Sequence, residues 1–126
     1  MCHHVRVQRG FAWSLDELDA ASCVHVSGEL DLHTVEALLP TLEQALSAGN
    51  PVILDCAAVT FMDSTALGHI HTFAQEAHAR QRCFVLVAAQ PSVLKVLRIT
   101  GLAAVLPIVA DLDAAQTYVR ITRAGS

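Results

Sequence analysis

Hydrophobic residues along this chain follow two alternating patterns, which predict two kinds of secondary structure. Short runs rich in β-branched residues predict buried strands, and longer stretches with apolar residues three or four positions apart predict helices with one buried face. The predicted strands cover residues 11–15, 23–26, 52–54, 83–87 and 104–108. Because strands and helices alternate, the pattern indicates an α/β fold in which helices cover a central sheet.

The first predicted helix has its apolar face over residues 35–46. Asp31 or Thr34 is expected to cap its N-terminus, and Gly49 is expected to end it. Pro40 lies within this helix and faces away from the apolar side. A proline at this position removes one backbone hydrogen bond, so we expect a kink there.

Three further helices are predicted from periodicity and end signals. The second begins at Asp63-Ser64-Thr65, the third begins at Pro91 and ends at Gly101, and the fourth covers residues 112–121 after a capping Asp111. The buried face of the second helix is expected to comprise Ala66, Leu67, Ile70, Phe73, Ala74 and Ala77.

Connection lengths and a proline indicate how the strands are arranged. A polar link over residues 16–21 is too short for a parallel crossover, so the first two strands are expected to pair antiparallel. Residues 52–54 form a continuous apolar run typical of central parallel strands, and residues 57–62 are expected to form a turn. Pro107 places the last strand at an edge. The sequence therefore predicts a mixed, mostly parallel sheet of about five strands with four helices.

The composition fits one globular domain. The chain has 126 residues, and we expect a single domain over residues 11–122 between tails at 1–10 and 123–126. Its 53% hydrophobic content excludes disorder, yet the longest apolar run, residues 102–110, is far shorter than the ~20 residues of a membrane span. A net charge of −4 without a basic stripe argues against nucleic acid as a direct ligand. No secretory signal is visible, which indicates a cytoplasmic protein.

The thiol and imidazole side chains indicate neither a metal site nor a cofactor. Three cysteines lie in or beside apolar runs without a Cys-x-x-Cys pair and are interpreted as small buried hydrophobic residues; they are Cys23, Cys56 and Cys83. No His-Glu-x-x-His spacing occurs, and three histidines are interpreted as lying at the rim of a buried helix face, namely His69, His71 and His78. Adventitious metal could bind at the N-terminus, at Cys2, His3 and His4.

Two polar segments carry the candidate chemistry. In residues 61–68, hydroxyl and carboxyl side chains precede an apolar helix, where such oxygens commonly cap free backbone N–H groups. The functional alternative is that Ser64 is exposed at a positive helix N-terminus, which tolerates an added phosphoryl group. A hydrolase nucleophile would need Gly-x-Ser-x-Gly around it, so we expect no enzyme. Residues 27–31 close a strand and open a helix, with Gly28 as a turn glycine beside capping acids.

Taken together, these segments resemble the STAS domain. The resemblance rests on Ser27-Gly28-Glu29-Leu30-Asp31, on the buried strand that ends near Asp55, and on Phe61-Met62-Asp63-Ser64-Thr65-Ala66-Leu67-Gly68. It extends from about Phe11 to Val119 and also includes residues 91–93, Leu97 and residues 100–102. Within this family the chain is most similar to bacterial anti-anti-sigma factors, which are anti-sigma factor antagonists.

The resemblance implies a STAS fold and a switch controlled by phosphorylation. Ser64 would be the acceptor, modified by a cognate anti-sigma factor that is also a serine-protein kinase. The unmodified protein would sequester this anti-sigma factor and release a sigma factor for transcription, and a serine phosphatase would restore it after phosphorylation. The partner-binding residues implied are Gly28, Glu29, Asp31, Asp63, Ser64, Thr65 and Leu67.

One position departs from the family pattern, because Ala66 stands where a glycine is common. We expect its methyl group to narrow the set of partners without affecting the fold, since a helix interior accepts alanine better than glycine. A different interpretation is a STAS scaffold subunit that is not phosphorylated, in a stress-signalling or transporter-associated assembly. A third is a small α/β enzyme or ligand-binding domain, for which the sequence offers no coherent set of catalytic residues.

Overall fold

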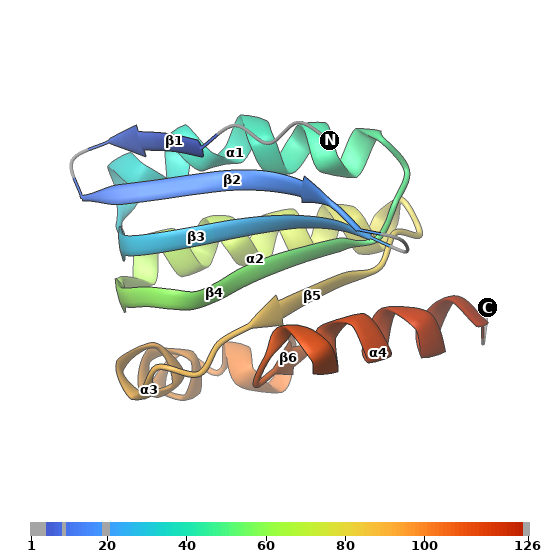
Figure 1. Ribbon diagram of the computed structural model, residues 1–126. Helices are drawn as coiled ribbons and strands as arrows, with labels where there is room; N and C mark the ends of the chain where they lie inside the picture. The colour runs from blue at the N-terminus through green and yellow to red at the C-terminus, as the bar shows by residue number, and fades with distance from the viewer. Residues whose placement is uncertain (1–4, 9, 19–20, 125–126) are drawn as a thin grey trace.

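Six strands form one sheet that carries helices on both faces (Figure 1). The computed structural model describes residues 5–8, 10–18 and 21–124. In chain order the elements are β1 (Val5–Gln8), β2 (Phe11–Glu17), β3 (Ser22–Leu30), α1 (Leu32–Ser47), β4 (Val52–Met62), α2 (Ser64–Ala79), β5 (Phe84–Val87), α3 (Pro91–Ile99), a 3₁₀ turn (Leu102–Ala104), β6 (Ile108–Val109) and α4 (Leu112–Ala124).

The strands lie side by side in chain order, from β1 at one edge to β6 at the other. β1, β2 and β3 pair antiparallel, whereas β3, β4, β5 and β6 pair parallel. This arrangement confirms the predicted mixed sheet, its four α-helices and the antiparallel first pair. The sheet has one strand more than expected, because residues 5–8, assigned to a tail, pair with β2.

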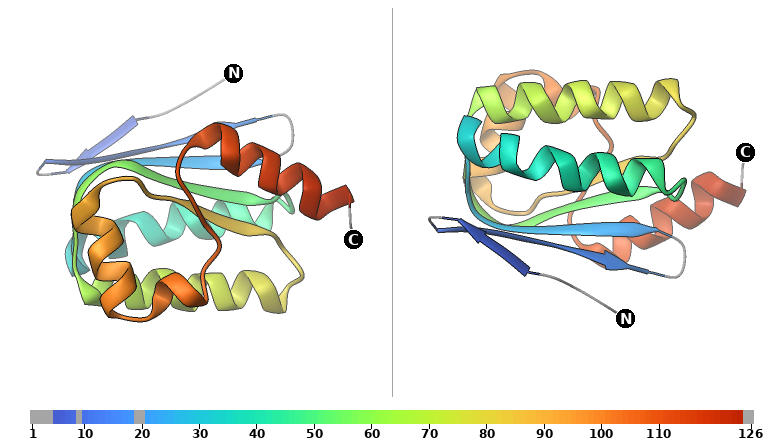
Figure 2. Two further views of the ribbon diagram at one scale, coloured as in Figure 1. Left: turned by 90° about the horizontal axis from the view of Figure 1, so that it is seen from below. Right: turned by 90° about the horizontal axis from the view of Figure 1, so that it is seen from above.

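Helices lie on both faces of the sheet (Figure 2), and a layer of buried side chains packs between sheet and helices on each face. On one face α1, α2 and α3 cover the larger core, which includes Leu38, Ile70 and Leu97. Trp13 belongs to this core, and its indole N–H donates to Thr41 Oγ1 on α1 at 3.0 Å. On the other face α4 covers a smaller cluster and leaves β2 and part of β3 uncovered. Each central strand therefore contributes alternate side chains to both layers.

The helix starts predicted from capping aspartates and from Pro91 are confirmed. The carboxylates of Asp31, Asp63 and Asp111 each accept a hydrogen bond from a backbone N–H in the first turn of the following helix. Pro91 occupies the first turn of α3. Pro40 is exposed, as expected, and α1 continues through it to Ser47.

Three strand predictions were wrong. Residues 57–62 are not a turn: β4 continues to Met62 because its backbone pairs with the second half of β3. Residues 16–17 likewise extend β2 rather than forming part of the link. The last strand is Ile108–Val109 instead of 104–108, and Pro107 lies just before it, with its carbonyl accepting from the N–H of Leu86 at 2.9 Å. The predicted position of this strand at the sheet edge is confirmed.

The cysteines in the described part of the chain are free thiols. Cys23 and Cys56 are fully buried, as predicted, whereas Cys83 is only partly buried. Cys2 and its neighbouring histidines lie outside the described residues. None of the described helices has both the length and the apolar character needed to cross a bilayer.

Candidate partner-binding and phosphorylation site

The two polar segments, residues 27–31 and 61–68, meet at the end of the sheet where β3 and β4 finish and α1 and α2 begin (Figure 1). This end of the sheet is called the polar edge below, and it is distinct from the outer strands β1 and β6. Glu29 pairs with Phe61 and Leu30 with Met62 across the parallel strands. The N–H of Asp63 then donates to the carbonyl oxygen of Leu30 at 3.2 Å. Strand pairing thus brings together residues that are more than thirty positions apart in the chain.

Ser64 is the first residue of α2 and is exposed to solvent. Asp63 precedes it as the N-cap, and its Oδ1 accepts from the N–H of Ala66 at 2.8 Å. Among the described residues, nothing hydrogen-bonds to the Ser64 hydroxyl group. Thr65, the next residue, is also exposed. The edge therefore presents two accessible hydroxyl groups at the positive end of a helix.

Acidic side chains lie beside this hydroxyl pair on the neighbouring strand and helix. Asp31 caps α1 in a reciprocal arrangement, because its N–H donates to Thr34 Oγ1 at 2.8 Å and its Oδ1 accepts from the Thr34 N–H at 3.1 Å. The Thr34 N–H holds the pKa of Asp31 below its usual value, so this carboxyl group is charged at neutral pH. Glu29 is exposed one position before the end of β3. With Asp63, these acids make the edge negative.

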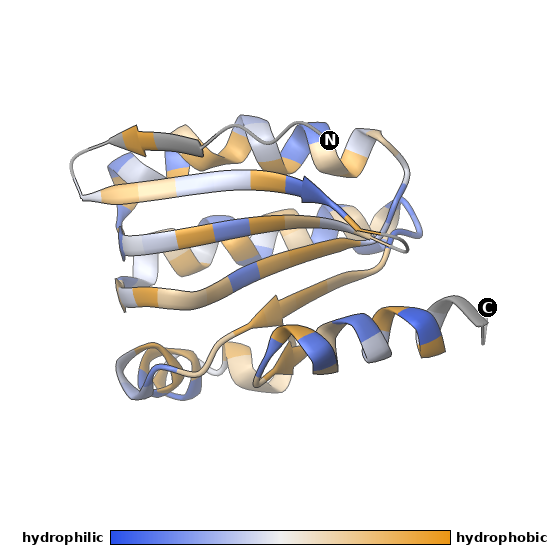
Figure 3. Cartoon of the chain, viewed as in Figure 1, coloured by the Kyte–Doolittle hydropathy of each residue, from blue (hydrophilic) through white to orange (hydrophobic). Residues whose placement is uncertain are grey.

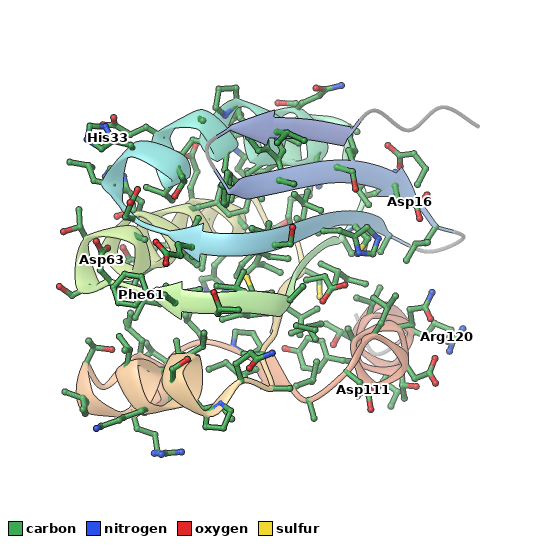
Figure 4. All side chains as sticks on the ribbon, turned by 60° about the vertical axis from the view of Figure 1, so that its left-hand side comes forward. Asp16, His33, Phe61, Asp63, Asp111 and Arg120 are labelled. Atoms are coloured by element: carbon green, nitrogen blue, oxygen red, sulfur yellow. The ribbon has the colours of Figure 1, made fainter. Side chains whose placement is uncertain are left out.

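Apolar side chains interrupt this polar edge. Phe61 is 47% exposed at the end of β4, and Leu32 is 40% exposed at the start of α1. Figure 4 shows Phe61, Asp63 and His33 at the same end of the molecule. Phe61 belongs to the segment on which the family resemblance rests, but it was not among the predicted partner-binding residues. The signal available was a phenylalanine directly before the polar helix start.

Two positions of the polar segment 61–68 belong to the core. Leu67 is fully buried, so its assignment as a partner-contact residue was wrong. Ala66 is also fully buried and cannot present its methyl group to a partner, which removes the expected effect on partner choice. Both side chains face the layer between α2 and the sheet. Their burial fixes the orientation of α2 and leaves Ser64 and Thr65 outside.

Gly28 lies within β3 rather than in a turn, and it is partly buried. Its φ of +99° is a conformation that residues with side chains rarely adopt. A Cβ added there would overlap the carbonyl oxygen of Gly10 and lie 3.1 Å from the Cα of Phe11. Gly28 therefore allows close packing of the β1–β2 turn against β3. Its contact with a partner stays a prediction.

A second polar cluster lies on the sheet face that α4 only partly covers. Figure 3 shows a hydrophilic band in each of the mostly hydrophobic strands β3 and β4. Here His25 Nδ1 hydrogen-bonds to Asp55 Oδ2 at 2.8 Å, and His25 Nε2 lies 3.8 Å from Asp16 Oδ2. The bond to Asp55 raises the pKa of His25 to about 10 and lowers that of Asp55. Sequence reasoning missed His25, although Cys23 and His25 are two apart on one strand and so share a face.

Comparison with known proteins assigns the chain to a family. A family model described as the STAS domain matches residues 12–115. The chain belongs to the STAS domain family. A Mycobacterium tuberculosis protein, Rv2638, provisionally named an anti-anti-sigma factor, is 31% identical to this STAS domain over 103 residues, covering 79% of this chain and 70% of the relative.

Solved structures agree with this assignment. An anti-sigma factor antagonist from Mycobacterium paratuberculosis is 30% identical, with a TM-score of 0.80 over 87% of this STAS domain and 94% of that chain. The anti-sigma factor antagonist SpoIIAA in its unphosphorylated form is 25% identical, with a TM-score of 0.72 over 86% and 96%. The phosphorylated form of SpoIIAA from Bacillus, 23% identical with a TM-score of 0.63 over 84% and 98%, shares the fold. The predicted STAS fold is thereby confirmed.

Proposed function

We propose that this STAS domain is an anti-sigma factor antagonist switched by phosphorylation of Ser64. In the unmodified state it binds and sequesters an anti-sigma factor that is also a serine-protein kinase, and a sigma factor is released for transcription. Phosphorylation by that kinase ends the complex, and a serine phosphatase restores the unmodified form. In this role the domain acts in the cytoplasm as a binding protein and catalyses no reaction.

The observation that carries the proposal is the position of Ser64. Its side chain is exposed at the first residue of α2, while the neighbouring Ala66 and Leu67 are buried and anchor the helix. A phosphoryl group there would carry about −1.5 to −2 charges and would face the positive end of the helix dipole. The fold can therefore accept the modification without repacking its core, which a reversible switch requires.

The surroundings of Ser64 also give a reason why phosphorylation would end partner binding. Phe61 and Leu32 are exposed apolar side chains that a partner can bury, and aromatic side chains are frequent anchors of interfaces. Glu29, Asp31 and Asp63 already make this edge negative. An added dianion would have to lose its hydration and would repel any acid of the partner. A loss of a few kcal/mol in binding free energy corresponds to a hundredfold or greater loss of affinity.

The direct test is modification by the cognate kinase with ATP, read by mass spectrometry of the peptide around α2. We expect one phosphoryl group on Ser64, none on the Ser64→Ala variant, and unchanged modification of the Thr65→Ala variant, which removes the adjacent exposed hydroxyl. Modification on Thr65 alone, or none on the wild-type chain, would contradict the assignment of Ser64.

Partner capture from the host tests the rest of the proposal. Ser64→Ala is the bait, because it is expected to stay folded and to bind without being modified, and Ser64→Glu is the charged counterpart, expected to bind more weakly. Recovery of a small ATP-binding anti-sigma factor by the first bait supports the proposal. Recovery of a large assembly or a transporter by both baits equally would instead favour a scaffold that does not depend on phosphorylation.

A further inference from the structure

The Cys23, His25 and Asp55 side chains converge on the sheet face opposite α1 and α2, away from the edge that carries Ser64. Cys23 and His25 are alternate residues of β3, and Asp55 on β4 is the direct strand partner of His25. The Sγ of Cys23 lies 3.8 Å from His25 Nδ1, which lies 2.8 Å from Asp55 Oδ2. One ligand-type atom from each residue thus lies within 4.8 Å of the other two.

These separations are close to those of a metal site. With zinc–ligand lengths of about 2.0–2.3 Å, tetrahedral coordination places the ligand atoms about 3.3–3.6 Å apart. The Nδ1–Oδ2 pair would have to open by about half an ångström, and the thiolate would have to approach the carboxylate. Both changes are side-chain rotations on a fixed strand pair. A thiolate, an imidazole and a carboxylate together suit Zn²⁺ better than Mg²⁺ or Ca²⁺, which prefer oxygen ligands alone.

Access and orientation also fit a metal site. The His25 and Asp55 side chains are 33% and 17% exposed, and they line a depression of about 200 Å³ with Ser14 and Ser27. An ion can therefore reach His25 and Asp55 from solvent and keep a water molecule as its fourth ligand, whereas Cys23 does not line the depression and would complete the site from its fully buried position. On the far side of the ring, His25 Nε2 lies 3.8 Å from Asp16 Oδ2 on β2. Proteins usually orient a ligating imidazole by a hydrogen bond from its other ring nitrogen to a carboxylate, and Asp16 would have to approach Nε2 by about 1 Å to form one.

We propose that this STAS domain binds Zn²⁺ through Cys23 Sγ, His25 Nδ1 and Asp55 Oδ2, with Asp16 as the positioning residue behind His25. The site is separate from the Ser64 edge and does not depend on the proposed antagonist function. Without the ion, the three polar groups satisfy one another by hydrogen bonds. With it, the metal replaces the proton shared by His25 and Asp55 and the proton of the Cys23 thiol.

Titration with Co²⁺, a spectroscopic substitute for Zn²⁺, tests the proposal in the whole chain of 126 residues. The starting variant carries Cys2→Ser, His3→Gln and His4→Gln, because these N-terminal residues are the other candidate metal ligands in the sequence. We expect one Co²⁺ per chain, visible d–d bands of tetrahedral strength and a thiolate-to-cobalt charge-transfer band, all removed by one equivalent of Zn²⁺.

Substitutions then identify the ligands. In this background, Cys23→Ser is expected to abolish the charge-transfer band, and His25→Gln and Asp55→Asn to weaken binding strongly. Asp16→Asn should weaken binding by about 10- to 100-fold while leaving the band in place, as expected of a residue that positions a ligand. Urea unfolding of each variant checks that it remains folded.

A matched control covers the case in which Cys23→Ser does not fold. Replacing Cys56 and Cys83 by serine in the same background leaves Cys23 as the one cysteine of the chain. This variant should keep the full charge-transfer band, because Cys56 faces the opposite layer and Cys83 lies outside the cluster. Loss of the band in this variant, its persistence in Cys23→Ser, or the absence of one-to-one binding in the starting variant would overturn the proposal.

Discussion

Gly28 offers the sharpest test of how the polar edge is built. Replacing it by alanine adds a methyl group at a φ of +99°, where its Cβ would overlap the carbonyl oxygen of Gly10. The unfavourable backbone conformation costs about 1–2 kcal/mol, and forcing an extra methyl group into packed surroundings costs about 1–3 kcal/mol. Gly28→Ala should therefore lower the free energy of unfolding by about 2–5 kcal/mol.

Two other glycines separate these contributions. Gly101 has a φ of +80° but nothing within 4 Å of an added Cβ, so Gly101→Ala should cost only the backbone contribution of about 1–2 kcal/mol. Gly68 is helical and also open, so Gly68→Ala should stabilise the chain by about 0.5–1 kcal/mol. The three variants form a graded series in which only Gly28 combines strain with overlap.

Urea unfolding followed by the fluorescence of Trp13, the only tryptophan, measures all three variants in one assay. The m-value is the slope of the unfolding free energy against urea concentration. If it is equal in all variants, their differences in unfolding free energy reflect the stability of the folded state. If Gly28→Ala lost no more stability than Gly101→Ala, the packing of the β1–β2 turn against β3 would be refuted as the reason for the glycine.

Three further substitutions test the site and the core. Asp63→Ala removes the cap of the Ala66 N–H and should lower the free energy of unfolding by about 1 kcal/mol in the same urea assay, and an unchanged value would contradict the capping role. Phe61→Ser should lower the free energy of unfolding by only about 1 kcal/mol, because the ring is half exposed, and weaken partner binding by at least about 1 kcal/mol in calorimetry. Trp13→Phe removes the hydrogen bond to Thr41 and should lower the free energy of unfolding by about 1 kcal/mol or more. Urea unfolding of this variant is followed by circular dichroism, because the fluorescent residue is gone. An unchanged free energy of unfolding would show that this bond contributes nothing to stability.

Sequence reasoning was most accurate for the helices and for the exposure of Ser64 at a helix start. A capping aspartate followed by apolar residues at helical spacing is local information, so the starts of α1, α2 and α4 could be placed from a few neighbouring residues. The exposure of Ser64 followed in the same way, since the first residue of a capped helix lies outside its apolar stripe. The strand at residues 5–8 was missed because four alternating residues carry too weak a signal.

The sequence by itself determined the α/β class, the helix ends and the polar segments, because these depend on periodicity and on side chains that bond within their own turn. Only the tertiary structure decided that β4 continues to Met62, since its backbone is satisfied by pairing with β3, a segment some thirty residues away. The same pairing unites the two polar segments at one edge and sets His25 beside Asp55. Contacts between strands are non-local, and no pattern within either strand specifies its partner's register.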